Sequence, residues 1–262
     1  MKKKLWWLAA FGTGVLLTVL TLLITTVAVS AAAFATELDD CIRQDNVLVI
    51  ATSNGSNEQE NPIYAAPDAS SDIISSLQGQ SCLVCDVSDV KAGSDYQFVK
   101  VLLPNFEAGF GYVSLDDFSL GTLDTESFGL SYIAASCKEQ RIEACRAALQ
   151  YIGNRYADGM YCMDILNYAY QAAGYDYDAS GSKAYNDDSY GREIPKGELA
   201  AGDILFYEGL NGGAYNHVAM YLGQGYVIQS THDRGYDYPQ AGVRITKLTF
   251  RSSPTGYRAP FR

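Results

Sequence analysis

The spacing of apolar residues changes once along this chain, near residue 140. From residue 46 to about residue 123, short apolar runs alternate with clusters of Asn, Ser, Gly and Asp, which is the pattern of a small all-β barrel. After residue 140, apolar residues recur every three or four positions in two stretches, which predicts two amphipathic helices. Strand-like runs follow at 202–207, 217–222 and 226–231. A helix pair ahead of a β-meander implies an α+β domain.

Both predicted helices end at a glycine. The first stops at Gly153, and the second, which begins near Cys162, stops at Gly174, the usual position for a C-terminal stop. The apolar face of the first helix consists of Ile142, Cys145, Leu149 and Ile152. Residues 175–198 are rich in Tyr, Asp, Ser and Gly without a sustained period, so they are predicted to form a long loop that borders a cleft.

The first 35 residues are predicted to lie outside the soluble fold. Three lysines precede a stretch from Leu5 to Ala35 that has no ionisable side chain. This hydrophobic helix is long enough for a secretory signal or for an uncleaved membrane anchor, and residues 33–35 have the small-x-small form of a cleavage site. In both cases the lysines stay in the cytoplasm and the rest of the chain is exported.

The charge of the exported part excludes nucleic acid as a partner. The 262 residues carry a formal charge of −11, and this becomes −14 without the first 35, which contain three lysines and no acidic residue. Such a surface repels phosphate backbones.

Export also changes how the six cysteines are interpreted, because disulfides persist outside the cytosol. They are Cys41, Cys82, Cys85, Cys137, Cys145 and Cys162. Cys82 and Cys85 have the spacing of a redox motif but lie in an apolar, strand-like run, so a packed or disulfide-linked pair is expected. The two histidines are far from this pair in the sequence, and no metal site is predicted.

Cys162 is the candidate nucleophile. It lies where the second helix begins, and a thiol in the first turn of a helix ionises more readily because it feels the positive end of the helix dipole. Asp164 is about 200° further round the helix, so its carboxylate is expected to point away from the thiol and to support the helix N-terminus. The alternative is that Cys162 is a further buried or disulfide-bonded cysteine.

His217 is the candidate base. A thiolate nucleophile needs an imidazole that takes its proton and returns it to the leaving group. The chain has only two histidines, and His217 opens a predicted strand on the face shared with Ala219 and Tyr221. The alternative is a surface histidine at the end of a strand.

The residue that orients the imidazole depends on the register of the hairpin. A three-residue loop, Gly223 to Gly225, would place Gln229 on the face of His217 as a diagonal neighbour. A two-residue loop would slip the register by one, turn Gln229 to the other side and bring His232 opposite His217. The glycines that flank Gln224 favour the longer loop, so Gln229 is predicted and His232 is the second candidate.

From about Arg141 to Tyr257 the chain resembles the NlpC-type papain-like cysteine peptidases of bacterial cell walls. The resemblance is carried by Gly153-Asn-Arg-Tyr156, Cys162 at a helix start, Ala201-Gly-Asp-Ile-Leu-Phe206, His217-Val-Ala-Met-Tyr-Leu-Gly223 and Val227-Ile-Gln229. Members cleave peptidoglycan stem peptides, commonly between D-glutamate and a diamino acid. The resemblance implies Cys162, His217 and Gln229 as catalytic residues. It also puts Tyr156 beside the nucleophile, where it helps the backbone N–H of Cys162 to hold the developing oxyanion.

The neighbours of Cys162 depart from the family pattern. Members usually have Asp-Cys-Ser-Gly, whereas this chain has Tyr161-Cys162-Met163-Asp164. The absent Asp and Ser help some relatives to recognise the free amino end of the stem peptide, so the departure bears on substrate choice. Gln229 stands where His is commoner, and it can orient the ring although it cannot stabilise imidazolium as a carboxylate does.

The β-rich segment resembles bacterial SH3-like domains over about 75 residues. The motifs are Ile63-Tyr-Ala-Ala-Pro67, Ser70-Ser-Asp-Ile-Ile74, Leu77-Gln-Gly79, Phe98-Val-Lys-Val101 and Gly111-Tyr-Val113. In relatives such domains often hold an enzyme on the cell wall through aromatic grooves. The candidates for such a groove are Tyr64, Tyr96, Phe98 and Tyr112, and the alternative is that most of them belong to the core.

The sequence therefore predicts four segments: a signal peptide or membrane anchor (1–35), a bacterial SH3-like domain (36–125), a linker (126–140) and an NlpC-type catalytic domain (141–262), in which helices pack on an antiparallel β-meander. The predicted function is that of an exported cell-wall hydrolase, secreted or membrane-anchored on the extracellular face of a bacterial cell. Its partner is peptidoglycan, and it needs no cofactor. Two alternatives stay open, a catalytically inactive wall-binding module and an amidase or acyltransferase with a substrate outside the wall.

Overall fold

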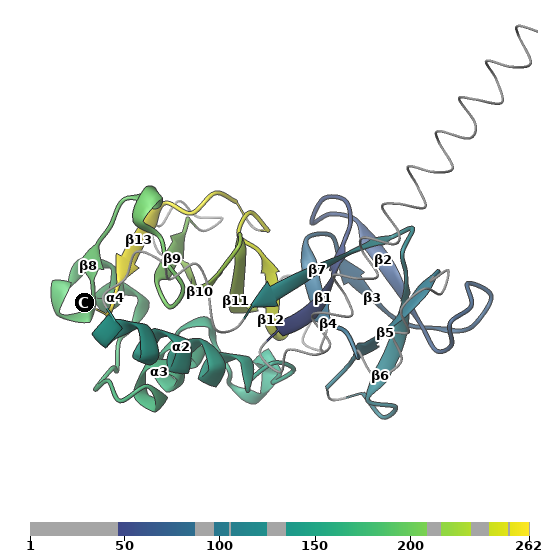
Figure 1. Cartoon of the computed structure of the whole chain (residues 1–262), viewed down its shortest axis with the longest axis horizontal. Helices are drawn as coiled ribbons and strands as arrows, with labels where there is room; N and C mark the ends of the chain where they lie inside the picture. Colours follow the sequence, from purple (N-terminus) through teal and green to yellow (C-terminus); the bar gives the residue numbers. More distant parts are fainter. Residues whose placement is uncertain are drawn as a thin grey trace, which may run out of the picture. The chain divides into compact units, whose positions relative to one another are not determined.

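The computed structural model describes residues 47–86, 97–104, 106–124, 135–208, 216–231, 241–250 and 252–261. Over these residues the chain forms two antiparallel sheets, with two long helices packed on the larger one (Figure 1). The predicted N-terminal hydrophobic helix lies outside the described residues. Among the helices that are described, none is both long and apolar enough to cross a membrane.

The N-terminal part, residues 47–124, consists of strands, as the short apolar runs predict. They are β1 (Val47–Ser53), β2 (Glu60–Tyr64), β3 (Ile73–Gln78), β4 (Ser81–Val84), β5 (Phe98–Leu102), β6 (Phe110–Ser114) and β7 (Phe118–Asp124). Four of them form the smaller sheet in the order β3-β2-β6-β5, and β7, β1 and β4 lie at one edge of the larger sheet. The β character of this segment is confirmed, whereas its likeness to SH3 domains stays a prediction.

The larger sheet continues through the C-terminal part, residues 135–261. Its further strands are β8 (Arg192–Glu193), β9 (Ile204–Tyr207), β10 (His217–Gly223), β11 (Tyr226–Thr231), β12 (Gly242–Lys247) and β13 (Gly256–Ala259). The order is β7-β1-β4-β12-β11-β10-β9-β13-β8, so β9 to β11 form the predicted meander and β12, which was not predicted, extends it. Strand β12 pairs with β4 of the N-terminal part, Ile245 opposite Cys82 and Thr246 opposite Ser81. One sheet therefore runs through both parts of the chain.

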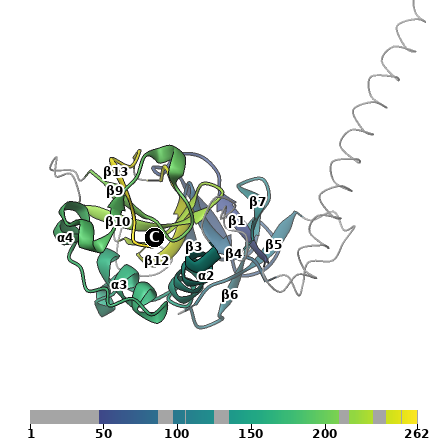
Figure 2. The same cartoon turned by 60° about the vertical axis from the view of Figure 1, so that its left-hand side comes forward.

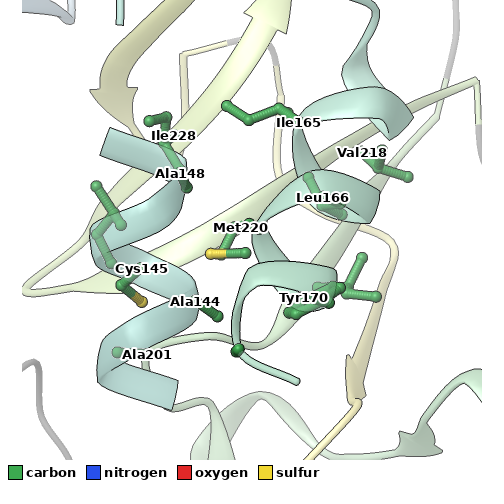
Figure 3. Close-up of a cluster of buried hydrophobic side chains, with 14 of the residues drawn as sticks. Ala144, Cys145, Ala148, Ile165, Leu166, Tyr170, Ala201, Val218, Met220 and Ile228 are labelled. Carbon is green, nitrogen blue, oxygen red and sulfur yellow. The ribbon is translucent and has the colours of Figure 1, made fainter. Parts of the chain in front are cut away.

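The helices α2 (Ala135–Leu149) and α3 (Cys162–Ala172) lie on the same side of the meander (Figure 2). Figure 3 shows the core between them: α2 contributes small side chains such as Ala144 and Ala148, and α3 contributes larger ones such as Leu166. Met220 and Ile228 reach this core from the sheet and are fully buried. Burying a side chain of that size stabilises the fold by roughly 1.5–3 kcal/mol.

Helix α2 starts earlier than its apolar period predicts, so residues 135–140 of the predicted linker 126–140 are helical. Its buried face is made of Cys137, Arg141, Ala144, Cys145 and Ala148, whereas Ile142 and Leu149 are only half-buried. Small side chains and an arginine give no hydrophobic signal, and this is why the period misses the first turns of the helix.

A buried ion pair ties α2 to the start of β9. The guanidinium of Arg141 donates to the carboxylate of Asp203 over 2.6 Å and to the carbonyl oxygen of Ala201 over 2.8 Å. Asp203 also accepts the backbone N–H of Ala200 over 2.7 Å. Because both charges are almost completely shielded from water, each depends on the other for compensation.

The predicted long loop, residues 175–198, contains short regular elements. They are α4 (Gly181–Asn186), the 3-10 turns η4 (Asp188–Tyr190) and η5 (Lys196–Glu198), and strand β8. Helix α4 is capped by the Ser180 hydroxyl, which accepts the backbone N–H of Lys183 over 3.3 Å. Elements of two to six residues are too short to show a hydrophobic period, so the prediction of a continuous loop was wrong.

Candidate active site

Cys162 is the first residue of α3, as its place in the sequence predicts. The chain reaches it through Tyr161, whose backbone is extended, and Met160, whose carbonyl oxygen accepts the Ser230 hydroxyl of β11 over 2.5 Å. Asp164 accepts the backbone N–H of Tyr161 over 2.9 Å, so its carboxylate caps the helix as expected. The segment that presents Cys162 is thus fixed to the sheet on one side and to its own helix on the other.

Cys162 is half-exposed, whereas the other four cysteines in the described part of the chain are buried. Burial raises the pKa of the Cys82 thiol to about 11 and the pKa values of Cys85 and Cys145 to about 12. These three are free, neutral thiols at pH 7, so Cys82 and Cys85 are a packed pair without a disulfide. Cys41 lies outside the described residues.

His217 is the first residue of β10, and only 4% of its surface is exposed. Tyr207 of β9 stands opposite it, with the two ring centroids 5.8 Å apart. The hydroxyl of Tyr207 donates to the carbonyl oxygen of Leu248 over 3.0 Å, which holds the tyrosine in place. The imidazole is therefore a packed group of the sheet and not a surface histidine at a strand end.

Gln229 of β11 contacts the imidazole directly. Its Oε1 lies 2.5 Å from Nε2 of His217, and its Nε2 donates to Oγ1 of Thr246 in β12 over 2.6 Å. An amide oxygen can only accept, so Nε2 of the imidazole carries the proton of this bond. In the neutral ring Nδ1 is then the unprotonated nitrogen, which is the one that can act as a base.

The β10–β11 hairpin has the predicted register but not the predicted loop. Met220 pairs with Ile228 and Tyr221 with Val227, which is the register expected from a three-residue loop, but Gly223 then pairs with Tyr226. The loop is thus two residues long, and Leu222 is a bulge that takes up the extra position. The expected pair of Leu222 with Tyr226 and the expected loop Gly223 to Gly225 were therefore wrong.

The two loop residues explain this geometry. Gln224 and Gly225 both have positive φ, 53° and 79°, as a type I′ turn requires. Such a turn matches the twist of the strands, and the bulge before it restores the alternation that keeps Gln229 on the side of His217. The second candidate for the orienting residue, His232, lies outside the described residues.

Tyr156 belongs to the 3-10 turn η3 (Tyr156–Asp158), in the loop that precedes α3. The loop is fixed to β12, because Gly153 donates its N–H to the carbonyl oxygen of Val243 over 3.0 Å and Val243 donates to that of Asn154 over 2.9 Å. The ring of Tyr156 packs edge-to-face on the ring of Tyr161, with centroids 4.8 Å apart. The structure thus places Tyr156 against the residue that precedes Cys162.

The aromatic candidates of the N-terminal part differ in how deeply they are buried. Tyr64 is buried with 9% exposed and packs edge-to-face on Phe98, with centroids 5.6 Å apart. Phe98 and Tyr112 are half-buried, and Tyr96 lies outside the described residues. Lys100 stands over the ring of Phe110 at 4.5 Å, between these aromatic residues on the sheet. Tyr64 is therefore core, while Phe98 and Tyr112 keep an accessible edge.

Two polar residues of the site escape prediction from the sequence. Thr246 holds the amide of Gln229 and Ser230 holds the turn before Cys162, and both are completely buried. The alternation Val243, Arg244, Ile245, Thr246 is the only signal for the strand β12, and an arginine at an inward position obscures it. Among the described residues, no three His, Cys, Asp or Glu side chains are grouped so that they could hold a metal ion.

Comparison with known proteins finds a family whose model matches part of the chain, and several similar proteins. Residues 149–249 match the NlpC/P60 family. Peptidoglycan endopeptidase RipA from Mycolicibacterium smegmatis is 35% identical over 91 residues, which are 35% of this chain and 17% of that relative. The chain thus spans about a sixth of the length of this curated relative.

Solved structures of low sequence identity are also similar. NlpC2 from Trichomonas vaginalis is 15% identical, with a TM-score of 0.41 over 82% of this chain and 73% of that one. An NlpC/P60 family protein from Bacillus cereus is 21% identical, with a TM-score of 0.38 over 87% and 67% of the two chains.

Proposed function

We propose, from the match of residues 149–249 to the NlpC/P60 family, that the chain is a cysteine peptidase that cleaves peptide bonds in peptidoglycan stem peptides. The observation that carries the proposal is the hydrogen bond between His217 and Gln229, which leaves Nδ1 of the imidazole as the basic nitrogen. A half-exposed cysteine at the start of α3 supplies a nucleophile of the kind that such a base serves. The named activity of the relative RipA supports the same substrate.

The proposed mechanism is acyl transfer through a thioester. The imidazole of His217 takes the thiol proton of Cys162, and the thiolate adds to the carbonyl carbon of the scissile amide. The backbone N–H of Cys162 and the hydroxyl of Tyr156 stabilise the oxyanion that forms. The C–N bond then breaks as the imidazolium returns its proton to the leaving amine. Water, deprotonated by the same imidazole, hydrolyses the thioester, releases the carboxylic acid and regenerates the thiol.

Gln229 makes this cycle possible by fixing the ring. Its carbonyl oxygen holds the Nε2 proton, so the ring can exchange a proton only through Nδ1. An amide carries no charge, and it stabilises the imidazolium less than a carboxylate would. We expect slower turnover than in an enzyme with a carboxylate at this place. By family resemblance, the bond cleaved is the one between D-glutamate and a diamino acid.

The residues beside Cys162 favour an uncharged group at the adjoining part of the substrate. Tyr161 is 50% exposed and forms an aromatic pair with Tyr156. The carboxylate of Asp164 is engaged by the backbone of Tyr161, so it serves the helix and not a ligand. Aromatic rings pack against apolar and acyl groups, and towards an ammonium group they offer only a cation–π contact and no ion pair. We therefore favour stem peptides that are still joined to their glycan over peptides with a free amino end.

The place of action follows from the N-terminal segment. The proposal includes export, with the chain secreted or held at the membrane by residues 1–35, and contact with the wall through the aromatic edge of Phe98 and Tyr112. Because the exported part is acidic, we expect stacking and hydrogen bonds to dominate wall binding, which should survive added salt.

The test is digestion of purified peptidoglycan by the full chain, followed by mass spectrometry of the released fragments. We expect new peptide termini with the wild type and none with Cys162→Ala. Tyr168→Ala, which alters an exposed residue of the same helix, should cut like the wild type. If the wild type binds the wall but does not cleave it, an inactive binding module is favoured. If the wild type neither cleaves nor binds the wall, an amidase or acyltransferase with a substrate outside it is favoured.

A further inference from the structure

Thr246 lies at the point where the two parts of the chain meet. In β12 it stands opposite Val227 of β11 on one side and opposite Ser81 of β4 on the other, and it is fully buried. Directly paired residues share a face of the sheet, and so do residues two apart in a strand. Thr246 and Gln229 are therefore diagonal neighbours on the face that carries His217.

The hydroxyl of Thr246 accepts a hydrogen bond from the amide of Gln229, and this contact favours one of the two ways in which the amide can point. A glutamine amide can turn either its oxygen or its NH₂ group towards a neighbour, with almost the same shape. Here the NH₂ group donates to Thr246 Oγ1 over 2.6 Å, so the oxygen faces His217. With the amide reversed, its NH₂ group would donate to Nε2 of the ring, and the ring proton would move to Nδ1. The imidazole would then present no base to a nucleophile.

The N-terminal part holds the strand that carries Thr246. Besides the β4–β12 pairs, Lys247 donates its backbone N–H to the carbonyl oxygen of Gln80 over 2.8 Å. The guanidinium of Arg244, which is 1% exposed and lies opposite Gln229, donates to Oε1 of Gln78 over 3.0 Å. The contacts on both sides of Thr246 therefore come from the same turn, β3 to β4, of the N-terminal part.

We propose that Thr246 is a positioning residue that sets the tautomer of His217 through Gln229, and that the N-terminal part belongs to the catalytic site because it braces β12. This inference rests on the proposed function in one respect: the tautomer affects catalysis only if the chain is a cysteine peptidase. The proposed state of the imidazole exists without substrate, so it can be measured separately.

The first experiment records the ring nitrogens by NMR in the full chain with Cys162→Ala and His232→Gln, at a pH where the single remaining imidazole, His217, is neutral. We expect protonated Nε2 in this background. Adding Thr246→Val, which keeps the shape and removes the acceptor, should raise the population with protonated Nδ1, and Thr246→Ser should restore the original state. The same tautomer in the Val and Thr proteins would overturn the proposal.

The second experiment measures cleavage kinetics over a range of pH. Thr246→Val should lower kcat by about 10–100-fold with little change in KM, as loss of an orienting partner commonly does. Thr246→Ser should recover most of the rate. Thr255→Val is the matched control: it makes the same substitution at an exposed threonine next to β13, outside the proposed site, and it should leave the rate unchanged. Equal kcat in the Val and Thr enzymes would overturn the proposal, and so would a Ser variant as slow as the Val variant.

The two readouts separate this inference from the proposed function. If the wild type cleaves no wall peptide, the tautomer shift still tests the role of Thr246. If cleavage depends on Cys162 while the tautomer does not respond to Thr246, the peptidase stands and the positioning role fails.

Discussion

The two faces of strands β10, β11 and β12 are both buried, yet they are ordered by different forces. On the helix side, Met220 and Ile228 pack among the apolar side chains of α2 and α3 (Figure 3). On the opposite side, His217, Gln229 and Thr246 are joined in a row by hydrogen bonds of 2.5 and 2.6 Å. Volume determines the fit on the first face, whereas the direction of donors and acceptors determines it on the second.

Because of this difference, substitutions on one face should change mainly stability and substitutions on the other should change mainly activity. A smaller side chain on the helix side leaves a cavity, which lowers the free energy of unfolding and leaves the chemistry intact. A changed donor or acceptor on the opposite side misdirects a proton and costs comparatively little stability. The following substitutions test this division, beginning with the largest expected effect.

Asp203→Ala should give the largest loss of stability. It leaves the buried guanidinium of Arg141 without its counter-charge, and removing one partner of a buried pair costs about 3–5 kcal/mol. Urea denaturation measures this loss. Asp158→Ala breaks the exposed pair with Arg155 and should leave the midpoint unchanged. Equal midpoints for the two variants would contradict the structural role of the buried pair.

Met220→Ala should lower the free energy of unfolding by about 3 kcal/mol, the usual cost of truncating a buried methionine. Met220 is fully buried between the helices and points away from the row of His217 and Gln229. At a temperature where the variant is folded, its kcat should therefore equal that of the wild type. A large fall in kcat of the folded variant would show that the two faces are not independent.

Gln229→Ala should show the opposite behaviour. Loss of the amide removes the group that orients His217, and we expect kcat to fall about 100-fold, while the unfolding free energy falls by only about 1–2 kcal/mol. His232→Ala serves as the comparison and should retain most of its rate. The reverse order of the two rates would mean that His232, and not Gln229, orients the imidazole.

Gln224→Gly should give the smallest effect, a gain in stability of about 0.5–1 kcal/mol. Gln224 has a φ of 53°, which is strained for a residue with a side chain and relaxed for glycine. Thermal unfolding measures the gain, and kcat should not change because the bulge at Leu222 keeps the register. A loss of stability would indicate that the side chain of Gln224 contributes more than the backbone strain costs.

The sequence predicts those parts of the fold whose signal is local. The strand β11 is predicted with its observed bounds, and α3 is predicted from Cys162 to the stop at Gly174 because its apolar residues recur at helical spacing. Cys162, His217 and Gln229 can be singled out because few residues of a chain with two histidines can perform this chemistry. The contact between His217 and Gln229 is observed, whereas the catalytic role of the three residues stays a prediction.

The parts that could not be predicted depend on contacts between distant segments. The first turns of α2 are stabilised by burial of Arg141 against Asp203, 62 residues further on, which no hydrophobic period reveals. The bulge at Leu222 changes the loop length without changing the register beyond it, so a rule based on loop length alone fails. Thr246 acquires its role only because β12 lies between β11 and β4 in the sheet.

The central claim is that His217 activates the thiol of Cys162. Its most direct test is the rate at which iodoacetamide alkylates Cys162, measured for each cysteine-containing peptide across a range of pH. The account predicts that Cys162 of the wild type reacts rapidly well below pH 8 and that His217→Ala abolishes this reactivity. Cys82, Cys85 and Cys145, whose pKa values burial raises to about 11, 12 and 12, should react only after unfolding. Equal rates at Cys162 with and without His217, or no reaction at Cys162 below pH 8, would contradict it.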